Sequence, residues 1–497
     1  MKESIVSVAE LMQTSGVAFG TSGARGLVSA MTDRVCHGYV TGFLQFLIED
    51  RAWAPGQRVA LAGDLRPSTP RILSACVQAV RDLGGEPVFC GYVPTPALAY
   101  WAFGQGVPSI MVTGSHIPDD RNGIKFNRPH GEILKEDEPG IMRQRVRFEA
   151  EGWNADGSMT QRPALPEPID PDQAYVDRYA DFFGTDALQG LKLGAYQHSA
   201  VGRDLLVRVL SALGAEVLPL GRSDTFVSVD TEAVRPEDVA LARKWAAEHQ
   251  LDAIASTDGD SDRPLLADHT GEWLRGDVLG VLCARELGAS SVVTPVSSNT
   301  LVEKCGAFAQ VHRTRIGSPY VVAAMNQALA DQEGVTCGYE ANGGFLLASD
   351  VSRGAARLTA LPTRDAVLPI VAALVAARPG RLADLLQALP PRVTFSDRLQ
   401  EFSPDRRDRL MAWLVDPDAA VRDARLEAEF GPIAGAALAE VDLTDGVRMT
   451  FANQQVIHLR GSGNAPELRC YTEADNAATA AELGRKALAL VAERFPA

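Results

Sequence analysis

A buried strand, an amphipathic helix and a second strand recur along this chain, and no other feature constrains its fold as strongly. Residues 59–64 predict a buried strand, residues 72–83 a helix that Gly84-Gly85 ends, and residues 87–90 a second strand. The helix shows a period near 3.6 in its apolar residues, whereas the strands are short continuous apolar runs. This succession is typical of a largely parallel sheet covered by helices.

The same pattern starts twice more after a proline-rich linker at residues 161–168. The second round predicts three strands and two helices: strands 191–196, 216–220 and 253–256, and helices 202–213 and 236–249. The third round predicts one strand and three helices: strand 291–295, and helices 277–286, 320–330 and 365–377. Three successive α/β units of similar size suggest a structural repeat, which sequence self-similarity alone does not prove.

The C-terminal segment differs from these units. Alternating apolar residues at 447–451 and 455–459 predict a hairpin, followed by a short strand at 468–472 and a helix from about 475 to 494. We therefore expect three related α/β domains with mixed, mostly parallel sheets, and a smaller C-terminal α+β domain. The expected domains span residues 1–165, 166–268, 269–388 and 389–497.

Composition excludes several classes of protein. A net charge of −15 argues against a nucleic-acid partner but allows a small phosphorylated substrate in a local basic pocket. The seven scattered cysteines include no Cys-x-x-Cys pair, so we expect free thiols in a reducing compartment. The longest apolar run, residues 366–377, is too short to span a bilayer, and the N-terminus lacks a signal-peptide pattern. We expect a soluble, cytoplasmic protein with no membrane partner.

One serine follows a predicted strand on a glycine-containing turn. Ser115 comes directly after residues 109–112 and Thr113-Gly114, a placement suited to covalent chemistry by its hydroxyl. It does not match the nucleophile elbow of hydrolases, which requires glycines two residues before and after the serine. His116 is adjacent in sequence but need not face Ser115, and a structural role is the alternative for it. Lys125 has a similar alternative as a surface lysine.

Three carboxylates recur at every second position after the predicted strand 253–256. They converge in a way suited to one hard cation, at Asp258, Asp260 and Asp262. The alternative is a solvated acidic turn, which is less favoured because three like charges repel one another. With so few protein ligands, Mg²⁺ completed by phosphate oxygens fits best.

A glycine-rich loop near the C-terminus combines anion-binding groups. It offers a guanidinium, a hydroxyl, an amide side chain and backbone N–H groups, at Arg460, Ser462, Gly463 and Asn464. These groups predict a phosphate-binding nest, with an ordinary hairpin turn as the alternative. Arg469 lies two residues after Glu467 along a strand and is expected to add charge on the same side.

Two further segments are ambiguous. Glu340 and Asn342, on one side of an extended segment, suit hydrogen bonding to sugar hydroxyls, or they belong to a simple turn. Arg25 lies in the glycine-rich run 19–26, which is either part of a site or a flexible N-terminal loop. That run lacks the Gly-Lys-Ser/Thr of a Walker loop.

In this order and spacing, the loops resemble those of the α-D-phosphohexomutase superfamily, which includes phosphomannomutases, phosphoglucomutases and phosphoglucosamine mutases. The family's catalytic loop, Thr-Ala-Ser-His-Asn-Pro and then Asn-Gly-x-Lys, is similar to residues 113–118 and 122–125. Its metal loop, Asp-Gly-Asp-x-Asp-Arg, is complete at 258–263. Weaker likenesses cover the sugar loop, the phosphate loop and two landmarks, at residues 339–343, 460–466, 63–68 and 94–96. The resemblance spans almost the whole chain.

The resemblance implies three α/β domains and a smaller fourth around a central cleft. It implies that Ser115 is carried as phosphoserine and ligates Mg²⁺ with Asp258, Asp260 and Asp262. It assigns the reaction centre to Arg25, His116 and Lys125. It places Arg263 beside the metal loop, Glu340 and Asn342 at the sugar, and the phosphate at Arg460, Ser462, Gly463 and Asn464.

On this basis we expect a phosphohexomutase, and among these a phosphomannomutase that interconverts mannose 6-phosphate and mannose 1-phosphate through a hexose 1,6-bisphosphate, which also serves as activator. The alternatives are a phosphoglucomutase, a metal-dependent sugar-phosphate phosphatase and an inactive sugar-phosphate-binding regulator. The expected partner is a hexose phosphate, and the chain is expected to be a monomer or homodimer.

Four positions depart from the family pattern. Asn342 replaces a serine, Gly344 and Ser318 stand where histidines are common, and Ile117 replaces an asparagine. They put the substrate in question more than the reaction type, and they leave His116 and Lys125 as the candidate bases.

Overall fold

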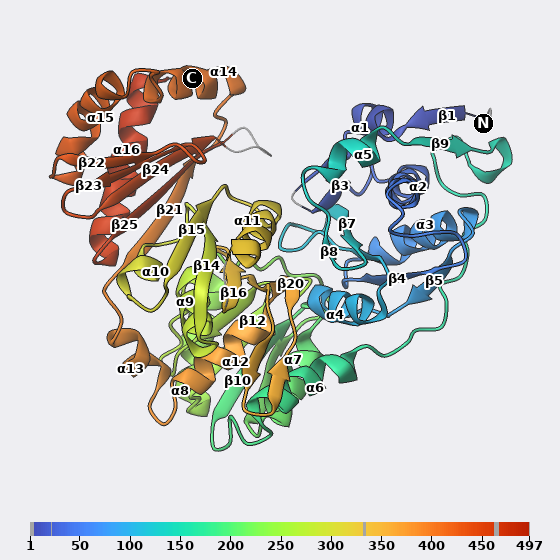
Figure 1. Ribbon diagram of the computed structural model, residues 1–497, viewed down its shortest axis with the longest axis horizontal. Coiled ribbons are helices and arrows are strands. Elements are labelled where there is room, and N and C mark those ends of the chain that lie inside the picture. Colours follow the sequence, from blue (N-terminus) through green and yellow to red (C-terminus); the bar gives the residue numbers. More distant parts are fainter. Residues whose placement is uncertain (1–3, 21, 332–333, 462–466, 497) are drawn as a thin grey trace. The chain divides into compact units, whose positions relative to one another are not determined.

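The computed structural model describes residues 4–20, 22–331, 334–461 and 467–496 (Figure 1). The chain forms two compact units. The first comprises Met1–Val292 and Gly317–Leu385, and the second comprises Val293–Ile316 and Leu386–Ala497. Among the described residues, no helix has both the length and the apolar character needed to cross a bilayer.

The first sheet of the first unit is mixed, with the order β2-β3-β7-β6-β4-β5. The strands expected at 59–64, 87–90 and 109–112 are present and pair in parallel, as β4 (Arg58–Gly63), β5 (Glu86–Phe89) and β6 (Ser109–Val112). Antiparallel strands complete one side of the sheet: β7 (Arg121–Arg128), β3 (Gly23–Leu27), β2 (Ala18–Phe19) and β8 (Gly131–Glu132). The chain reversal after β6 turns the segment that contains Ser115 back toward β7.

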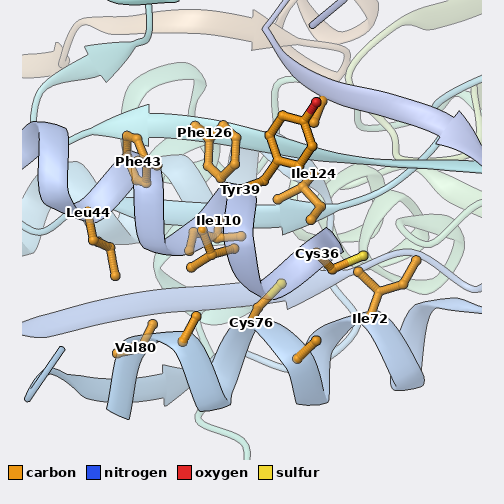
Figure 2. Packing of buried hydrophobic residues seen from close by; sticks show 14 of the residues in the cluster. Cys36, Tyr39, Phe43, Leu44, Ile72, Cys76, Val80, Ile110, Ile124 and Phe126 are labelled. Carbon is orange, nitrogen blue, oxygen red and sulfur yellow. The ribbon is translucent and has the colours of Figure 1, made fainter. Parts of the chain in front are cut away.

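Two helices contribute to one apolar core, which Figure 2 shows between α2 (Asp33–Glu49), α3 (Thr69–Asp82) and the sheet. The expected helix 72–83 is α3, and it buries side chains spaced four residues apart, at Ile72, Cys76 and Val80. Phe43 of α2 stacks on Phe126 of β7 with ring centroids 4.6 Å apart. This packing fixes β7, the strand that carries Lys125.

Other elements of this part of the chain are short. They are β1 (Ser4–Ser7), α1 (Val8–Ser15), α4 (Thr95–Gln105), α5 (Asp137–Met142), β9 (Arg145–Phe148), η1 (Ala150–Gly152) and α6 (Asp172–Phe183). Residues 161–171, between η1 and α6, contain no helix or strand, as the proline-rich composition predicted.

The second sheet has the order β11-β10-β12-β13. Its parallel strands are those expected: β10 (Lys192–His198), β11 (Glu216–Arg222) and β12 (Ala253–Thr257). The expected helices are α7 (Arg203–Ala212) and α8 (Pro236–His249). The chain leaves β12, makes the aspartate-rich turn and returns antiparallel as β13 (Pro264–Ala267). A tight reversal therefore holds the three aspartates at the end of a buried strand.

In the third sheet, strands β14, β16, β17 and β20 are successive neighbours: β14 (Ala289–Pro295), β16 (Val335–Tyr339), β17 (Phe345–Leu347) and β20 (Leu361–Asp365). Three helices of this region match the expectation: α9 (Gly276–Glu286), α11 (Ser318–Asp331) and α12 (Val367–Ala376). The longest apolar run of the chain is α12, whose residues 367–374 are all buried. The small hairpin β18 (Val351–Arg353) and β19 (Ala356–Leu358) lies between β17 and β20 in sequence.

The second unit carries an antiparallel sheet with the order β21-β25-β24-β23-β22. The predicted hairpin is β23 (Val447–Phe451) with β24 (Val456–Gly461), and the predicted final strand and helix are β25 (Leu468–Ala474) and α16 (Ala477–Arg494). The sequence did not indicate β21 (Val393–Leu399), α14 (Pro404–Leu414), α15 (Ala419–Ala434) and β22 (Leu438–Asp442). The remaining elements are α10 (Leu301–Lys304), β15 (Gln310–Thr314) and α13 (Leu382–Gln387). The C-terminal α+β domain is thus present.

All seven cysteines are free, as expected, and only Cys305 is partly exposed.

Candidate active site

Ser115 lies in the turn after β6, and its backbone is held in an unusual conformation. Its φ of +56° lies in the left-handed region, and Ser115 is only 1% exposed. The Ser115 backbone N–H donates to Thr113 Oγ1 at 2.8 Å. A left-handed non-glycine residue costs about 1–3 kcal/mol and persists only where its surroundings hold it. The surrounding structure therefore fixes the direction in which this hydroxyl is presented.

Arg66 is the main support of the Ser115 turn. Its guanidinium donates to four backbone oxygens, those of Ser115, Ile117, Pro118 and Arg121. It also pairs with the fully buried Asp64 at 3.0 Å, and Asp64 Oδ2 accepts from Thr113 Oγ1 at 2.7 Å. A Cβ on Gly114 would lie 2.6 Å from Arg66 Cζ, so this glycine gives the guanidinium its room. The landmark at residues 63–68 thus shapes the Ser115 turn.

The structure brings Ser115 and the three aspartates together. Ser115 Oγ donates to Asp258 Oδ2 at 2.7 Å. The three carboxylates are buried, and each offers an oxygen within 4.8 Å of the others, at Asp258, Asp260 and Asp262. A Cβ on Gly259 would lie 2.7 Å from Ser115 O, so the glycine permits the close approach of the two loops.

The donor set of this cluster fits a hard divalent cation. Asp260 Oδ1 and Asp262 Oδ1 are buried and have no hydrogen-bond partner among the described residues. Carboxylate oxygens gathered in this way are the ligands that Mg²⁺ prefers. Burial, together with the charges of Asp260 and Asp262, raises the pKa of Asp258 well above its usual value. Full ionisation of the three carboxylates is therefore unfavourable unless nearby cations compensate their charge.

Lys125 is the closest such cation. It projects from β7, and its Nζ donates to Asp260 Oδ2 at 2.5 Å and to Asp262 Oδ2 at 2.6 Å. Burial alone would lower the pKa of Lys125, but the two carboxylates outweigh burial and raise it. Lys125 is therefore a protonated, largely buried ammonium at the aspartates and not a surface lysine.

His116 lies between Ser115 and Arg263. Its Nδ1 is 3.4 Å from Ser115 Oγ and 2.9 Å from Arg263 Nη1. Because a guanidinium can only donate, Nδ1 accepts this hydrogen bond, and the ring is neutral with its proton on Nε2. Burial, and next the charge of Arg263, lowers the pKa of His116 to about 3. His116 thus faces Ser115 as a neutral imidazole.

Arg25 lies on a strand, which corrects the expectation of a loop. It belongs to β3 and stands opposite Gly123 of β7. Burial, and next the charge of Arg263, lowers the pKa of Arg25 to about 10. Within the described part of the chain, its guanidinium forms no hydrogen bond. A half-buried cation in this state is available to an anionic ligand.

The sugar loop is a tight turn between β16 and β17, so of the two expectations the turn is present and the extended segment is not. The Glu340 N–H donates to Gly344 O at 3.2 Å, and the Gly343 N–H donates to Glu340 O at 2.9 Å. Asn342 Oδ1 accepts from the Gly344 N–H at 2.9 Å, which closes the turn. The side-chain oxygen of Asn342 is thus engaged, and its amide nitrogen is the group left for a ligand.

Two residues that the sequence reasoning did not assign also contact the aspartates. Thr95, at the start of α4, donates from Oγ1 to Asp260 Oδ2 at 2.6 Å. Arg364, at the end of β20, donates from Nε to Glu340 Oε2 at 2.5 Å and lies 3.5 Å from Asp262 Oδ2. The signal that could have found Arg364 is two consecutive charged residues, 364 and 365, directly before the apolar helix α12.

The predicted phosphate loop lies on the second unit. Arg460 is the second-last residue of β24 and donates from Nε to Asp445 Oδ1 at 2.7 Å. Arg469 of β25 stands directly opposite Arg460, so both side chains are on one face of the sheet. Three predicted members of this loop, Ser462, Gly463 and Asn464, lie outside the described residues.

Comparison with known proteins agrees with this arrangement of loops. Three family models match, described as phosphoglucomutase/phosphomannomutase alpha/beta/alpha domains I, II and III, at residues 16–149, 173–271 and 275–393. A phosphomannomutase of Salmonella muenchen is 44% identical over 477 residues, which cover 95% of each chain. The chain belongs to the phosphoglucomutase/phosphomannomutase family.

Further relatives of this family support the fold over the full length. A phosphomannomutase of Sinorhizobium fredii is 43% identical over 481 residues, covering 96% of this chain and 99% of that protein. The crystal structure of a phosphoglucomutase/phosphomannomutase family protein from Burkholderia thailandensis superposes with a TM-score of 0.73 at 21% identity, covering 99% of this chain and 98% of that one. At that identity the structural likeness speaks for the fold alone.

Proposed function

We propose that this member of the family is a phosphomannomutase that interconverts mannose 6-phosphate and mannose 1-phosphate, with Ser115 as the carrier of the transferred phosphoryl group. The observation that carries the proposal is the 2.7 Å contact between Ser115 Oγ and Asp258, inside a buried cluster of three aspartates and several cations. The full-length relatives at 44% and 43% identity, both named phosphomannomutase, support mannose as the sugar.

Ser115, Asp258, Asp260 and Asp262 are the residues proposed to hold Mg²⁺. The two buried carboxylate oxygens without a hydrogen-bond partner among the described residues favour this assignment. When bound, such an ion would neutralise charge on a transferring phosphoryl group. Arg25, Lys125 and Arg263 are proposed to supply further positive charge there, since a phosphoserine carries nearly two negative charges at neutral pH.

In the proposed reaction, the phosphorus–oxygen bond to Ser115 Oγ breaks as a hydroxyl oxygen of the hexose phosphate bonds to phosphorus. The proton of that hydroxyl replaces the phosphoryl group on Ser115. Lys125 is held protonated by two carboxylates and cannot accept this proton, which leaves His116 as the candidate carrier. His116 Nδ1 must first release the hydrogen bond that it accepts from Arg263. The other phosphate of the resulting hexose 1,6-bisphosphate then returns to Ser115 by the reverse step, and an added bisphosphate would serve as activator.

We propose that Glu340 and Asn342 bind the hexose hydroxyls, and that Arg460, Ser462, Gly463, Asn464 and Arg469 bind the phosphate that is not being transferred. The shared face of Arg460 and Arg469 supports a doubly charged phosphate-binding surface.

We also propose domains at 1–165, 166–268, 269–388 and 389–497, because each of the four larger sheets has its strands within one of these ranges.

The competing activities are a phosphoglucomutase and a metal-dependent phosphatase. A coupled assay with mannose 1-phosphate, glucose 1-phosphate and glucosamine 1-phosphate, each with Mg²⁺ and hexose 1,6-bisphosphate, separates the sugars. Release of inorganic phosphate, measured in parallel, tests for the phosphatase. We expect mannose 1-phosphate to give the highest kcat/KM and phosphate release to be negligible. Ser115→Ala should remove turnover and leave the folded structure intact, and near-normal turnover in this variant would contradict the mechanism.

A further inference from the structure

Arg364 joins the sugar loop to the aspartate cluster. The residue is 3% exposed and is the second-last residue of β20. Its Nε donates to Glu340 Oε2 at 2.5 Å, and its Nη1 lies 3.5 Å from Asp262 Oδ2. The shorter contact is a charge-assisted hydrogen bond, which is roughly twice as strong as a neutral one. The stronger of the two interactions of Arg364 is therefore the one with Glu340.

Gly344 makes room for Arg364. A Cβ at position 344 would lie 2.7 Å from Arg364 Cδ and 3.0 Å from its Cγ. The φ of Gly344 is not left-handed, so its backbone conformation does not require a glycine. A side chain at position 344 would therefore meet Arg364 first and also Asn342 Oδ1, which lies 3.1 Å from the same Cβ position. Arg364 can therefore keep this position only while residue 344 has no side chain.

Because of this contact, the two oxygens of the Glu340 carboxylate differ in their hydrogen bonding. Oε2 is taken by Arg364, whereas Oε1 accepts no hydrogen bond within the described residues. Glu340 is only 4% exposed, and a buried carboxylate is costly unless it is paired and hydrogen-bonded, which Arg364 provides here. With Oε2 fixed, Oε1 keeps one direction and can accept from a hydroxyl group.

We propose that Arg364 is a substrate-positioning residue, which holds Glu340 so that its Oε1 accepts hydrogen bonds from the hexose hydroxyls. This inference rests on the proposed function, because it takes Glu340 as the sugar ligand. A purely structural arginine would instead support folding, so its loss would lower the amount of active protein without changing the affinity of the remaining sites for substrate.

The test compares Arg364→Gln, Arg364→Lys, Glu340→Gln and the double variant Arg364→Gln/Glu340→Gln. Steady-state kcat and KM for mannose 1-phosphate are measured for each with Mg²⁺ and bisphosphate. Loss of a charged hydrogen bond predicts a KM raised by about tenfold to a hundredfold in Arg364→Gln, with a smaller change in kcat. Arg364→Lys keeps the charge and should recover part of the affinity. The double variant should be no worse than the poorer single variant, because the two residues act through one contact.

Gly344→Ala tests the position of Arg364 by filling the space beside it. The added methyl group should displace Arg364 and raise KM in the otherwise unchanged chain, but it should have little effect when Arg364→Gln is already present. Arg178→Gln is the matched control. Arg178 is also buried and lies in the first unit, but its hydrogen bond is to Thr359 Oγ1 and its ring contacts are to Tyr100 and Tyr179. That variant should lose stability and keep its KM.

Three results would overturn the inference: an unchanged KM in Arg364→Gln, a loss confined to kcat and stability, or additive losses in the double variant. Calorimetric binding of mannose 6-phosphate to the unaltered chain and to Arg364→Gln gives a readout that does not depend on turnover, and equal affinities would also overturn it. Failure of the proposed function looks different, because the unaltered chain would then neither turn over nor bind the mannose phosphates.

Discussion

Replacement of Lys125 by methionine is the sharpest test of the charge balance at the aspartate cluster. Methionine nearly preserves the volume of the lysine stem and removes its ammonium group. In the unaltered chain that group donates to Asp260 at 2.5 Å and to Asp262 at 2.6 Å, and both carboxylates are buried. The variant would leave three buried carboxylates close together without their nearest cation.

The cost follows from the burial of the pair. Removing one partner of a buried ion pair destabilises a protein by about 3–5 kcal/mol, since the remaining charge stays uncompensated. The first unit has about 360 residues, so its unfolding entropy is about 0.75 kcal/mol/K. The two figures give a Tm lowered by about 4–7 °C in the absence of divalent ions.

Thermal unfolding in EDTA and in Mg²⁺ measures this effect. Any ligand that binds only the folded state adds about 2.7 kcal/mol at one hundred times its Kd. Mg²⁺ should therefore raise the Tm of Lys125→Met more than that of the unaltered chain, because it replaces the missing positive charge. Lys244→Met is the control. Lys244 is 62% exposed and 3.8 Å from Glu248, so its loss should cost less than about 1 kcal/mol. A Lys125→Met protein as stable as the control in EDTA would refute the reasoning.

Two further predictions concern stability alone. Burial lowers the pKa of His458 in the second unit to about 4, so the unfolded chain binds the extra proton between pH 6.5 and about 4. As the pH falls through that window, His458 should lower the free energy of unfolding of this unit by about 1.4 kcal/mol per pH unit. Urea unfolding at pH 7 and pH 5 should show a smaller loss of stability in His458→Gln than in the unaltered chain. Equal losses would contradict the assignment. Asp33 accepts from the Met159 N–H, Arg71 and Arg162, and although burial raises its pKa these contacts outweigh burial and lower it. The stabilisation by the Asp33 carboxylate is therefore present at neutral pH and is lost as the pH falls through its lowered pKa. Asp33→Asn should cost about 2–3 kcal/mol of stability at pH 7 and less at pH 3. A loss of stability that does not depend on pH would contradict this explanation.

The sequence predicted the parts of the fold that depend on local patterns. Strands such as β4 and β10 are continuous apolar runs, and α3 shows the helical spacing of its buried residues, so each could be located within a few residues. The antiparallel strand β3 was missed, because residues 23–27 hold two glycines and an arginine and lack an apolar pattern. Its strand conformation depends on pairing with β7, which is a long-range contact.

The candidate site divides in the same way. Ser115 and the aspartates could be proposed from spacing, since each loop carries its own signal. The support by Arg66 and the contact of Arg364 with Glu340 could not, because each joins segments that only the folded chain brings together. The direction of His116 was also beyond the sequence, since it depends on the left-handed conformation of Ser115 and on Arg263.

Phosphorylation of Ser115 is the most direct test of the central claim, that this serine carries the transferred phosphoryl group. The unaltered chain is incubated with hexose 1,6-bisphosphate and Mg²⁺, and the modified residue is mapped by peptide mass spectrometry before and after addition of mannose 6-phosphate. We expect one phosphoryl group on Ser115 and its loss on addition of the sugar phosphate, with matching formation of bisphosphate. A chain that turns over mannose 1-phosphate while Ser115 stays unmodified, or while another residue carries the phosphoryl group, would contradict it.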